Sequence, residues 1–118
     1  MLTDIFTLDS KVAIYVPSTN EVNKEDAAGL QTKFVNTLIA EFSRMFGGAT
    51  AMDVRGGWMC DNGQIVTENV QIVYSFCTGA AFEANAAAVV GLAKRICKEM
   101  SQEAVTLEYN NRVAFITA

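Results

Sequence analysis

Phe46–Phe76, with the sequence FGGATAMDVRGGWMCDNGQIVTENVQIVYSF, is the stretch that decides the fold of this chain. Asn62–Gly63 is the strongest short-range signal of a β-hairpin, because both central residues of such a turn take a positive φ. The segments on either side of it contain many β-branched and aromatic residues, which favour strands. We therefore expect one long hairpin in the middle of the chain, turning at Asn62–Gly63.

A plain two-residue turn, however, gives this hairpin a register that is wrong for burial. The apolar residues of its first strand then point to the opposite side from those of its second strand. They are Met52, Val54 and Trp58 on the first strand, and Val70 and Ile72 on the second. One extra residue in one strand would correct the mismatch, and Gly56–Gly57 is the natural place for it. The sequence therefore predicts a β-bulge there, which would splay Arg55 and Trp58 away from a regular ladder.

Two helices and three further strands are expected around the hairpin. Apolar residues recur at three- and four-residue spacing from Asn23 to Phe46 and again from Gly79 to Ser101, which is typical of amphipathic helices. The expected helix ends are N-caps at Asn23 and Thr78 and a left-handed stop at Gly47–Gly48. The expected strands are Lys11–Pro17, Glu103–Tyr109 and Arg112–Thr117, with a turn at Asn110–Asn111. The order predicts an α+β, ferredoxin-like β-α-β-β-α-β fold with an extra C-terminal strand and two helices on one face of an antiparallel sheet.

The length and composition predict a single domain that associates with copies of itself. The 118 residues fit one domain, 1–118, in which 1–10 form an N-terminal arm. Hydrophobic residues make up 51 % of the chain and the mean hydropathy is +0.21, which is high for a small monomer with proportionally much surface. The second helix also carries a stripe of small residues, which reflects either helix propensity and close packing on the sheet or a helix–helix contact in an oligomer. This stripe consists of Ala80, Ala84, Ala87, Ala88 and Gly91.

Several classes of function and site are disfavoured by the charge and the residue types. A net charge of −4 gives no basic field for bulk nucleic acid. The absence of histidine removes histidine-based catalysis and imidazole metal ligands. Cys60, Cys77 and Cys97 are too widely spaced for a zinc site or a disulfide framework, and we interpret them as small apolar residues of a reducing cytosol. We expect no cofactor, no metal, no signal peptide and no membrane span, and hence a cytoplasmic protein.

Glu68 and Trp58 are the most informative candidates for a site. Glu68 alternates with Val66 and Val70, so it points to the side of the strand that is expected to be buried. An unpaired carboxylate there would raise the free energy of the folded state. Arg55 is its expected partner, unless the bulge turns Glu68 to solvent. Trp58, next to two glycines, offers a flat aromatic surface to a ring-shaped ligand, although a tryptophan more often belongs to a core or an interface.

The sequence also resembles a family of small clostridial and bacillar proteins associated with phages and plasmids. The segments that carry the resemblance are KVAIYVPST (11–19), FGGATA (46–51), GGW (56–58), GQIVTENV (63–70) and QEAVTLEYNNRVAFI (102–116). In size and oligomer-prone composition the chain is similar to the Thoeris anti-defence proteins, which sequester cyclic ADP-ribose-type signals without cleaving them. For such a protein, Phe82 and Arg112 are residues of the right type to contact the ligand.

The leading functional hypothesis is an oligomeric, non-enzymatic protein that sequesters a small nucleotide-like ligand between its subunits. A ring of the ligand would stack on Trp58, Tyr74 or Phe82, and Arg55 or Arg112 would contact phosphate. If a phage encodes the chain, its location is the host cytosol. One alternative is a protein–protein inhibitor or adaptor of a host system. The other is a small enzyme that uses Glu68 as a base.

Overall fold

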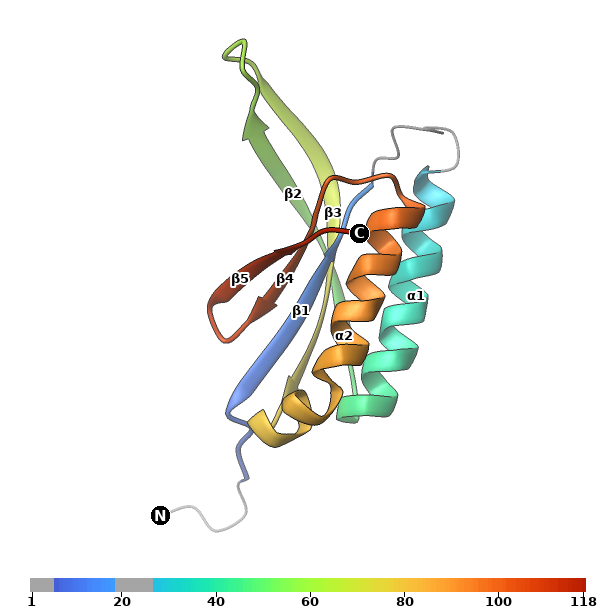
Figure 1. Ribbon diagram of the computed structural model, residues 1–118, viewed down its shortest axis with the longest axis vertical. Helices are drawn as coiled ribbons and strands as arrows, with labels where there is room; N and C mark the ends of the chain where they lie inside the picture. The colour runs from blue at the N-terminus through green and yellow to red at the C-terminus, as the bar shows by residue number, and fades with distance from the viewer. Residues whose placement is uncertain (1–5, 19–26) are drawn as a thin grey trace.

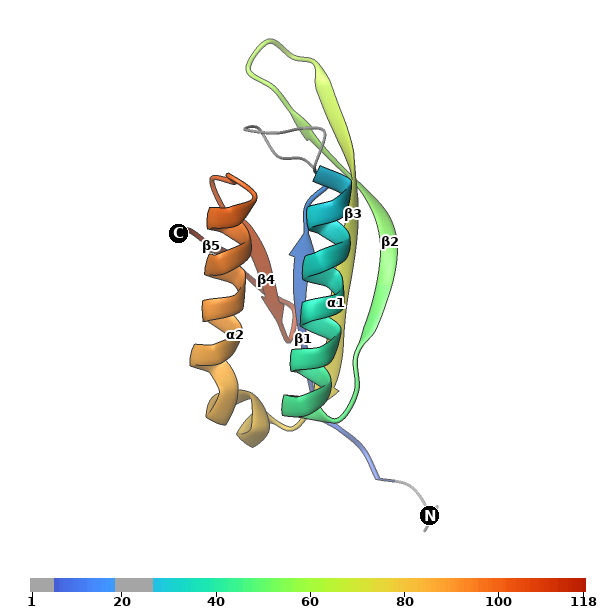
Figure 2. The ribbon, with the colours of Figure 1, turned by 90° about the vertical axis from the view of Figure 1, so that its right-hand side faces the viewer.

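A computed structural model describes residues 6–18 and 27–118. Its elements are β1 (Ser10–Val16), α1 (Ala27–Phe46), β2 (Thr50–Met59), β3 (Ile65–Cys77), α2 (Gly79–Glu99), β4 (Val105–Tyr109) and β5 (Arg112–Ile116). The strands form one antiparallel sheet in the order β2-β3-β1-β4-β5. Both helices lie on the same side of the sheet (Figures 1 and 2). The predicted fold class, including the extra C-terminal strand, is confirmed.

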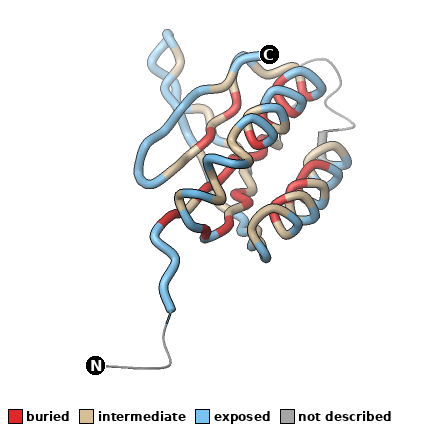
Figure 3. The backbone as a smooth tube through the Cα atoms, turned by 60° about the horizontal axis from the view of Figure 1, so that its bottom comes forward, coloured by how far each residue is buried: buried red, intermediate tan, exposed pale blue. Residues whose placement is uncertain are grey.

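The core lies between the helices and the sheet surface that they cover, which we call the inner face (Figure 3). The sheet contributes alternate residues of its central strands, and each helix contributes one apolar side. The sheet residues are Val12, Ile14, Val16, Val73, Cys77, Val105 and Leu107. The helix residues are Phe34, Val35, Leu38, Phe42, Val89, Ala93, Ile96 and Cys97, together with Met100 at the C-cap of α2. The opposite surface of the sheet, which neither helix covers, is the outer face.

Most of the predicted helix ends and turns are confirmed. The Thr78 hydroxyl accepts a hydrogen bond of 3.1 Å from the backbone N–H of Ala81, which caps α2. Gly47 ends α1 with a φ of +94°, and Asn110 and Asn111 turn with φ values of +50° and +67°. The predicted cap at Asn23 lies outside the described residues.

The register of the β2–β3 hairpin contradicts the predicted bulge. The ladder runs without interruption from Thr50 opposite Tyr74 to Met59 opposite Ile65, and Gly56–Gly57 stays inside it. The extra residue lies in the turn instead. Cys60 and Gln64 close a three-residue loop, since the Cys60 N–H donates to the Gln64 carbonyl (2.7 Å) and the Gly63 N–H donates to the Cys60 carbonyl (2.9 Å).

This loop corrects the mismatch of the apolar sides. Gly63 has a φ of +83°, the left-handed conformation that such a three-residue hairpin loop requires. With one residue more than a two-residue turn, Met52, Val54 and Trp58 stand opposite Ile72, Val70 and Val66. A correction of one residue was needed, as expected, but it lies at Asp61–Gly63 and not at Gly56–Gly57.

The side of β3 that carries Val66, Glu68 and Val70 belongs to the outer face. The expectation that the helices bury this side is wrong, because they cover Val73 and Cys77 of the alternate set. The second half of β3 is apolar on both sides, so its hydrophobic pattern alone does not tell which side faces the helices.

The distal part of the hairpin extends past the ends of the helices (Figure 1). Met59 and Ile65, which pair with each other near its tip, are 67 % and 60 % exposed. The hairpin is therefore apolar in a region where neither helix packs against it.

The cysteines and the small residues of α2 differ partly from expectation. Cys77 and Cys97 are buried, as expected, whereas Cys60 at the hairpin loop is partly exposed. The stripe from Ala80 to Gly91 is exposed, so the interpretation that it packs on the sheet is wrong. Within the described ranges, the helices lack the combination of length and hydropathy needed to cross a membrane.

Gly63→Ala should lower the free energy of unfolding by about 1–2 kcal/mol, because an L-residue is strained in the left-handed conformation. Gly91→Ala is the matched control. Gly91 is exposed in the middle of α2, so the same change there should raise stability by roughly 0.5–1 kcal/mol. Urea denaturation at equal protein concentrations measures both. Equal effects at the two positions would contradict the role given to Gly63.

Candidate functional site

Large exposed apolar side chains gather on the outer face. Cross-strand partners leave a sheet on the same side, so the pairings of all five strands assign each residue to a face. The outer-face members are Met52 (42 % exposed), Trp58 (48 %), Phe76 (55 %), Val113 (53 %) and Phe115 (72 %). They come from β2 and β3 on one side of the sheet and from β5 at its other edge, so apolar side chains are exposed at both ends of the outer face.

A small hollow opens on this face around Glu68. It is lined by Tyr15, Pro17, Glu68, Val70, Gln102, Ala104, Val105 and Thr106, and its volume is about 130 Å³. It therefore joins the end of β1, the middle of β3 and the segment leading into β4. These parts are distant in the sequence, and only the sheet order brings them together.

Glu68 is held in this hollow by the segment that follows β1. One of its oxygens, Oε2, accepts hydrogen bonds from the Ser18 backbone N–H (3.2 Å) and from the Ser18 hydroxyl (3.3 Å). The side chain is half-buried. The predicted pairing with Arg55 is wrong, because Arg55 stands opposite Asn69 and leaves the sheet on the inner side. The alternative, in which Glu68 is turned to solvent, does not fit its half-buried position either.

A tyrosine–carboxylate pair lies beside the hollow. The Tyr15 hydroxyl donates a hydrogen bond of 2.7 Å to Oε1 of Glu108. The hydrogen bond to this carboxylate raises the pKa of Tyr15, and burial and the negative charge of Glu108 raise it further. The outer face therefore carries two carboxylates, Glu68 on β3 and Glu108 on β4, with the Tyr15 ring among them.

Trp58 lies on the same face as Glu68, one step along the hairpin. Gly56 stands directly opposite Glu68, and Trp58 stands opposite Val66. Diagonal neighbours of this kind are within reach of long and aromatic side chains. The Val70 side chain lies beside Gly56, 3.4 Å from the place that a Cβ atom would take there, and the exposed indole of Trp58 is on the same face.

The other predicted site residues lie elsewhere. Tyr74 is on the outer face, with the Lys11 ammonium 4.6 Å from its ring centre. Phe82, at the start of α2, stacks on Tyr109 with ring centres 3.8 Å apart on the helix side of the sheet. Arg112 pairs with Tyr109 and belongs to that side as well. One chain thus brings Glu68, Trp58 and Tyr74 to one face and keeps Arg55, Phe82 and Arg112 away from it.

Ser18 and Tyr15 were missed by sequence reasoning. The available signal was weak: Tyr15 alternates with buried residues in an apolar strand, and Ser18 follows the single proline. Among the residues that the structure describes, no group of three acidic or cysteine side chains is arranged to hold a metal ion.

Comparisons with known proteins identify related folds. No protein-family model matches the chain, and no curated protein matches it. A phage SAM lyase in complex with S-methyl-5′-thioadenosine superposes with a TM-score of 0.63 at 21 % identity, over 100 % of this chain and 96 % of the lyase. A phage SAM lyase in the apo state gives 0.62 at 23 % identity, over 100 % and 97 %. CutA from Synechococcus elongatus gives 0.50 at 11 %, over 95 % and 85 %. At these identities the likeness shows a shared fold.

The Tyr15–Glu108 pair should be visible in an alkaline titration. Folding favours the protonated phenol when its pKa is raised, so this contribution to stability is complete below the ordinary tyrosine value of about 10 and is lost as the pH rises through the folded-state value. Phenolate absorbance should reveal one late-titrating tyrosine in the folded protein. Tyr15→Phe should remove it and Glu108→Gln should shift it downward, while Tyr74→Phe should leave it in place. A late tyrosine that survives Tyr15→Phe would contradict the assignment.

Proposed function

We propose that this protein is an oligomeric binder of a small cationic adenosine derivative, of which S-adenosylmethionine is the type. The site is the hollow around Glu68, extended over Gly56 to Trp58. The single observation that carries the proposal is the Glu68 carboxylate, half-buried on an apolar sheet face, anchored by Ser18 and next to an exposed indole.

The charges of this region favour a cation. Glu68 and Glu108 both lie on the outer face, and the two arginines that sequence reasoning assigned to phosphate leave the sheet on the inner side. Partial burial strengthens the attraction between a carboxylate and a positive group, because the effective dielectric constant is lower there than in water. A sulfonium or ammonium group therefore suits this region better than a pyrophosphate.

The aromatic part of the ligand has a suitable surface in Trp58. Its indole lies on the outer face and is 48 % exposed. An adenine ring would gain stacking and apolar contact there while the positive group meets Glu68. The phage SAM lyase with bound S-methyl-5′-thioadenosine, which shares the fold, supports this choice of ligand class.

One chain does not enclose such a ligand. Pockets that bury a ligand of drug size usually measure roughly 300–1,000 Å³, and the hollow measures about 130 Å³. A second copy laid on the apolar outer face would complete the walls and cover the exposed aromatic residues. We therefore propose sites at boundaries between subunits, with binding and not cleavage as the primary activity.

Calorimetry with S-adenosylmethionine tests this function. The protein should bind it, and Glu68→Gln should weaken binding about tenfold or more, since a hydrogen bond or contact to a charged group contributes about 1.5–3 kcal/mol. Glu103→Gln is the matched control, because Glu103 is an exposed carboxylate next to Gln102 of the hollow, and it should bind as the unchanged protein does.

The same samples separate the competing functions. Recovery of intact S-adenosylmethionine after denaturation in cold acid supports binding alone, whereas methylthioadenosine formed in excess of a protein-free sample would identify a lyase and overturn the non-enzymatic proposal. Cyclic ADP-ribose isomers are the second set of ligands. Binding of those isomers without S-adenosylmethionine would overturn the cationic ligand class and favour the nucleotide sponge that the sequence resemblance implies.

The subunit boundary has its own test, which also decides the role of the small residues on α2. Phe115→Glu places a charge on the outer face and should dissociate the assembly, whereas Ala84→Glu, on the exposed side of α2, should leave it intact. Size-exclusion chromatography with light scattering measures the mass. Dissociation by Ala84→Glu alone would move the interface to the helices.

A further inference from the structure

The helix layer carries a basic groove that the proposed ligand site does not use. Lys33 of α1 and Arg95 of α2 pair with one carboxylate, Glu99, and Lys94 and Lys98 lie near them on α2. Three of these basic residues line a hollow of about 480 Å³, together with Glu99 and Ala118. We call the set Lys33, Lys94, Arg95, Lys98 and Glu99 the helix groove. Its residues belong mainly to α1 and α2, which lie on the opposite side of the sheet from the outer face (Figures 1 and 2).

Glu99 organises this groove by holding a cation on each helix. Its Oε2 accepts a hydrogen bond of 2.7 Å from Nε of Arg95, and its Oε1 lies 3.5 Å from Nζ of Lys33. Both cations also lie near the ring of the buried Phe34, at 5.5 Å for Arg95 and 5.3 Å for Lys33. The hydrogen bond from Arg95 lowers the pKa of Glu99, and the positive charges of Arg95 and Lys33 add to this effect.

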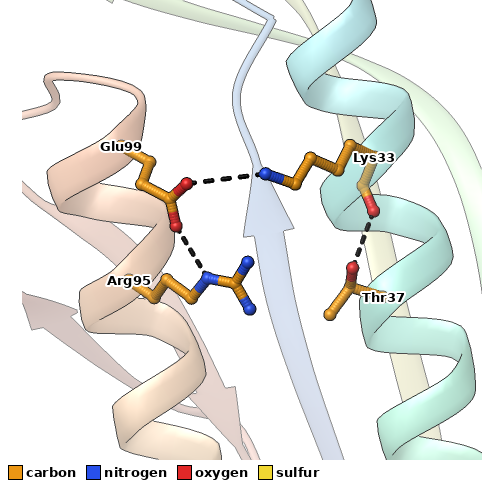
Figure 4. Close-up of polar contacts among 4 residues, drawn as sticks. All are labelled: Lys33, Thr37, Arg95 and Glu99. Carbon is orange, nitrogen blue, oxygen red and sulfur yellow. Dashed lines mark hydrogen bonds and ion pairs between the residues drawn. The ribbon is translucent and has the colours of Figure 1, made fainter.

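Arg95 is oriented so that its binding edge stays available. Glu99 engages Nε, and the two terminal nitrogens point away from Glu99 toward α1 (Figure 4). These two nitrogens form the fork that grips a carboxylate in bidentate fashion. An arginine held in this way loses less rotamer freedom on binding than a mobile one. The loss of side-chain conformational entropy on binding is therefore smaller.

The local charge is opposite to that of the whole chain. The helix groove contains four of the nine basic side chains and one of the thirteen acidic ones, so it carries +3, while the remainder of a chain of net −4 carries −7. Such a separation of charge favours a small acidic partner over a long polyanion. The negative remainder repels the phosphate backbone beyond the groove, whereas a short acidic segment fits within it.

We propose that the helix groove is a docking surface for an acidic peptide segment of another protein, with Arg95 taking one carboxylate in bidentate fashion and Lys94 and Lys98 taking neighbouring ones. Docking leaves the outer face uncovered, so this binding does not depend on the ligand proposed above. It gives the protein a second point of contact, on the helix layer.

A labelled hexaglutamate peptide, measured by fluorescence anisotropy at low salt, tests the proposal, with hexaglutamine as the neutral control peptide. The unchanged protein should bind hexaglutamate and not hexaglutamine. Arg95→Gln should weaken binding about tenfold, and Arg95→Lys should weaken it by less but measurably, because lysine keeps the charge and loses the fork. Arg44→Gln is the matched control: Arg44 is also an exposed helix arginine paired to a glutamate, but it lies at the other end of α1, and its loss should leave binding unchanged.

Four outcomes would overturn the proposal. The first two are no binding of hexaglutamate, and binding of hexaglutamine as strong as that of hexaglutamate. The third is an equal loss of peptide affinity in Arg95→Gln and Arg44→Gln, and the fourth is displacement of the peptide by inorganic pyrophosphate at a far lower concentration than by unlabelled peptide. The last result would assign the groove to phosphate. Failure of S-adenosylmethionine binding leaves this test unaffected, because the two surfaces lie on opposite layers.

Discussion

A left-handed glycine in a three-residue loop sets the register of the central hairpin, and the arrangement of the outer face depends on that register. Gly63 places Gly56 opposite Glu68 and Trp58 opposite Val66. A slip by one residue would send every β2 side chain to the other face. Trp58 would then no longer lie beside Glu68, and the apolar residues of β2 and β3 would lie on opposite faces of the sheet. The candidate site is thus a consequence of turn geometry some residues away.

The two apolar sides of β3 connect this site to assembly. The helices cover the side that contains Val73 and Cys77, which leaves Ile72, Tyr74 and Phe76 for the other side. When a second copy covers that side, water leaves the surroundings of Glu68 and the local dielectric constant falls. The attraction between its carboxylate and a cation then grows, and the desolvation free energy of the carboxylate without a cation rises. Under the proposed function, association of copies and binding of a cationic ligand would therefore favour each other.

Local signals were enough to predict the fold, and long-range pairings were needed to predict the site. Periodicity, the Thr78 cap, Gly47 and the Asn110–Asn111 turn act within a few residues, so the order of elements follows from the sequence. The hydrogen bond between Tyr15 and Glu108 joins residues 93 positions apart, and the one between Ser18 and Glu68 spans 50. Such partners depend on strand order and register between strands that are distant in the sequence, which local signals do not determine.

The separation of apolar and charged surfaces also determines how an assembly would present itself. If copies cover their outer faces with one another, the helices are left on the outside, because they occupy the other side of every sheet. Each copy then exposes its helix groove, and Glu99 keeps Arg95 oriented there. Several grooves on one particle raise the effective concentration for a partner with repeated acidic segments, so weak single contacts add up to strong binding. In such an assembly, burial of the outer face would turn a modest charge patch into a multivalent surface.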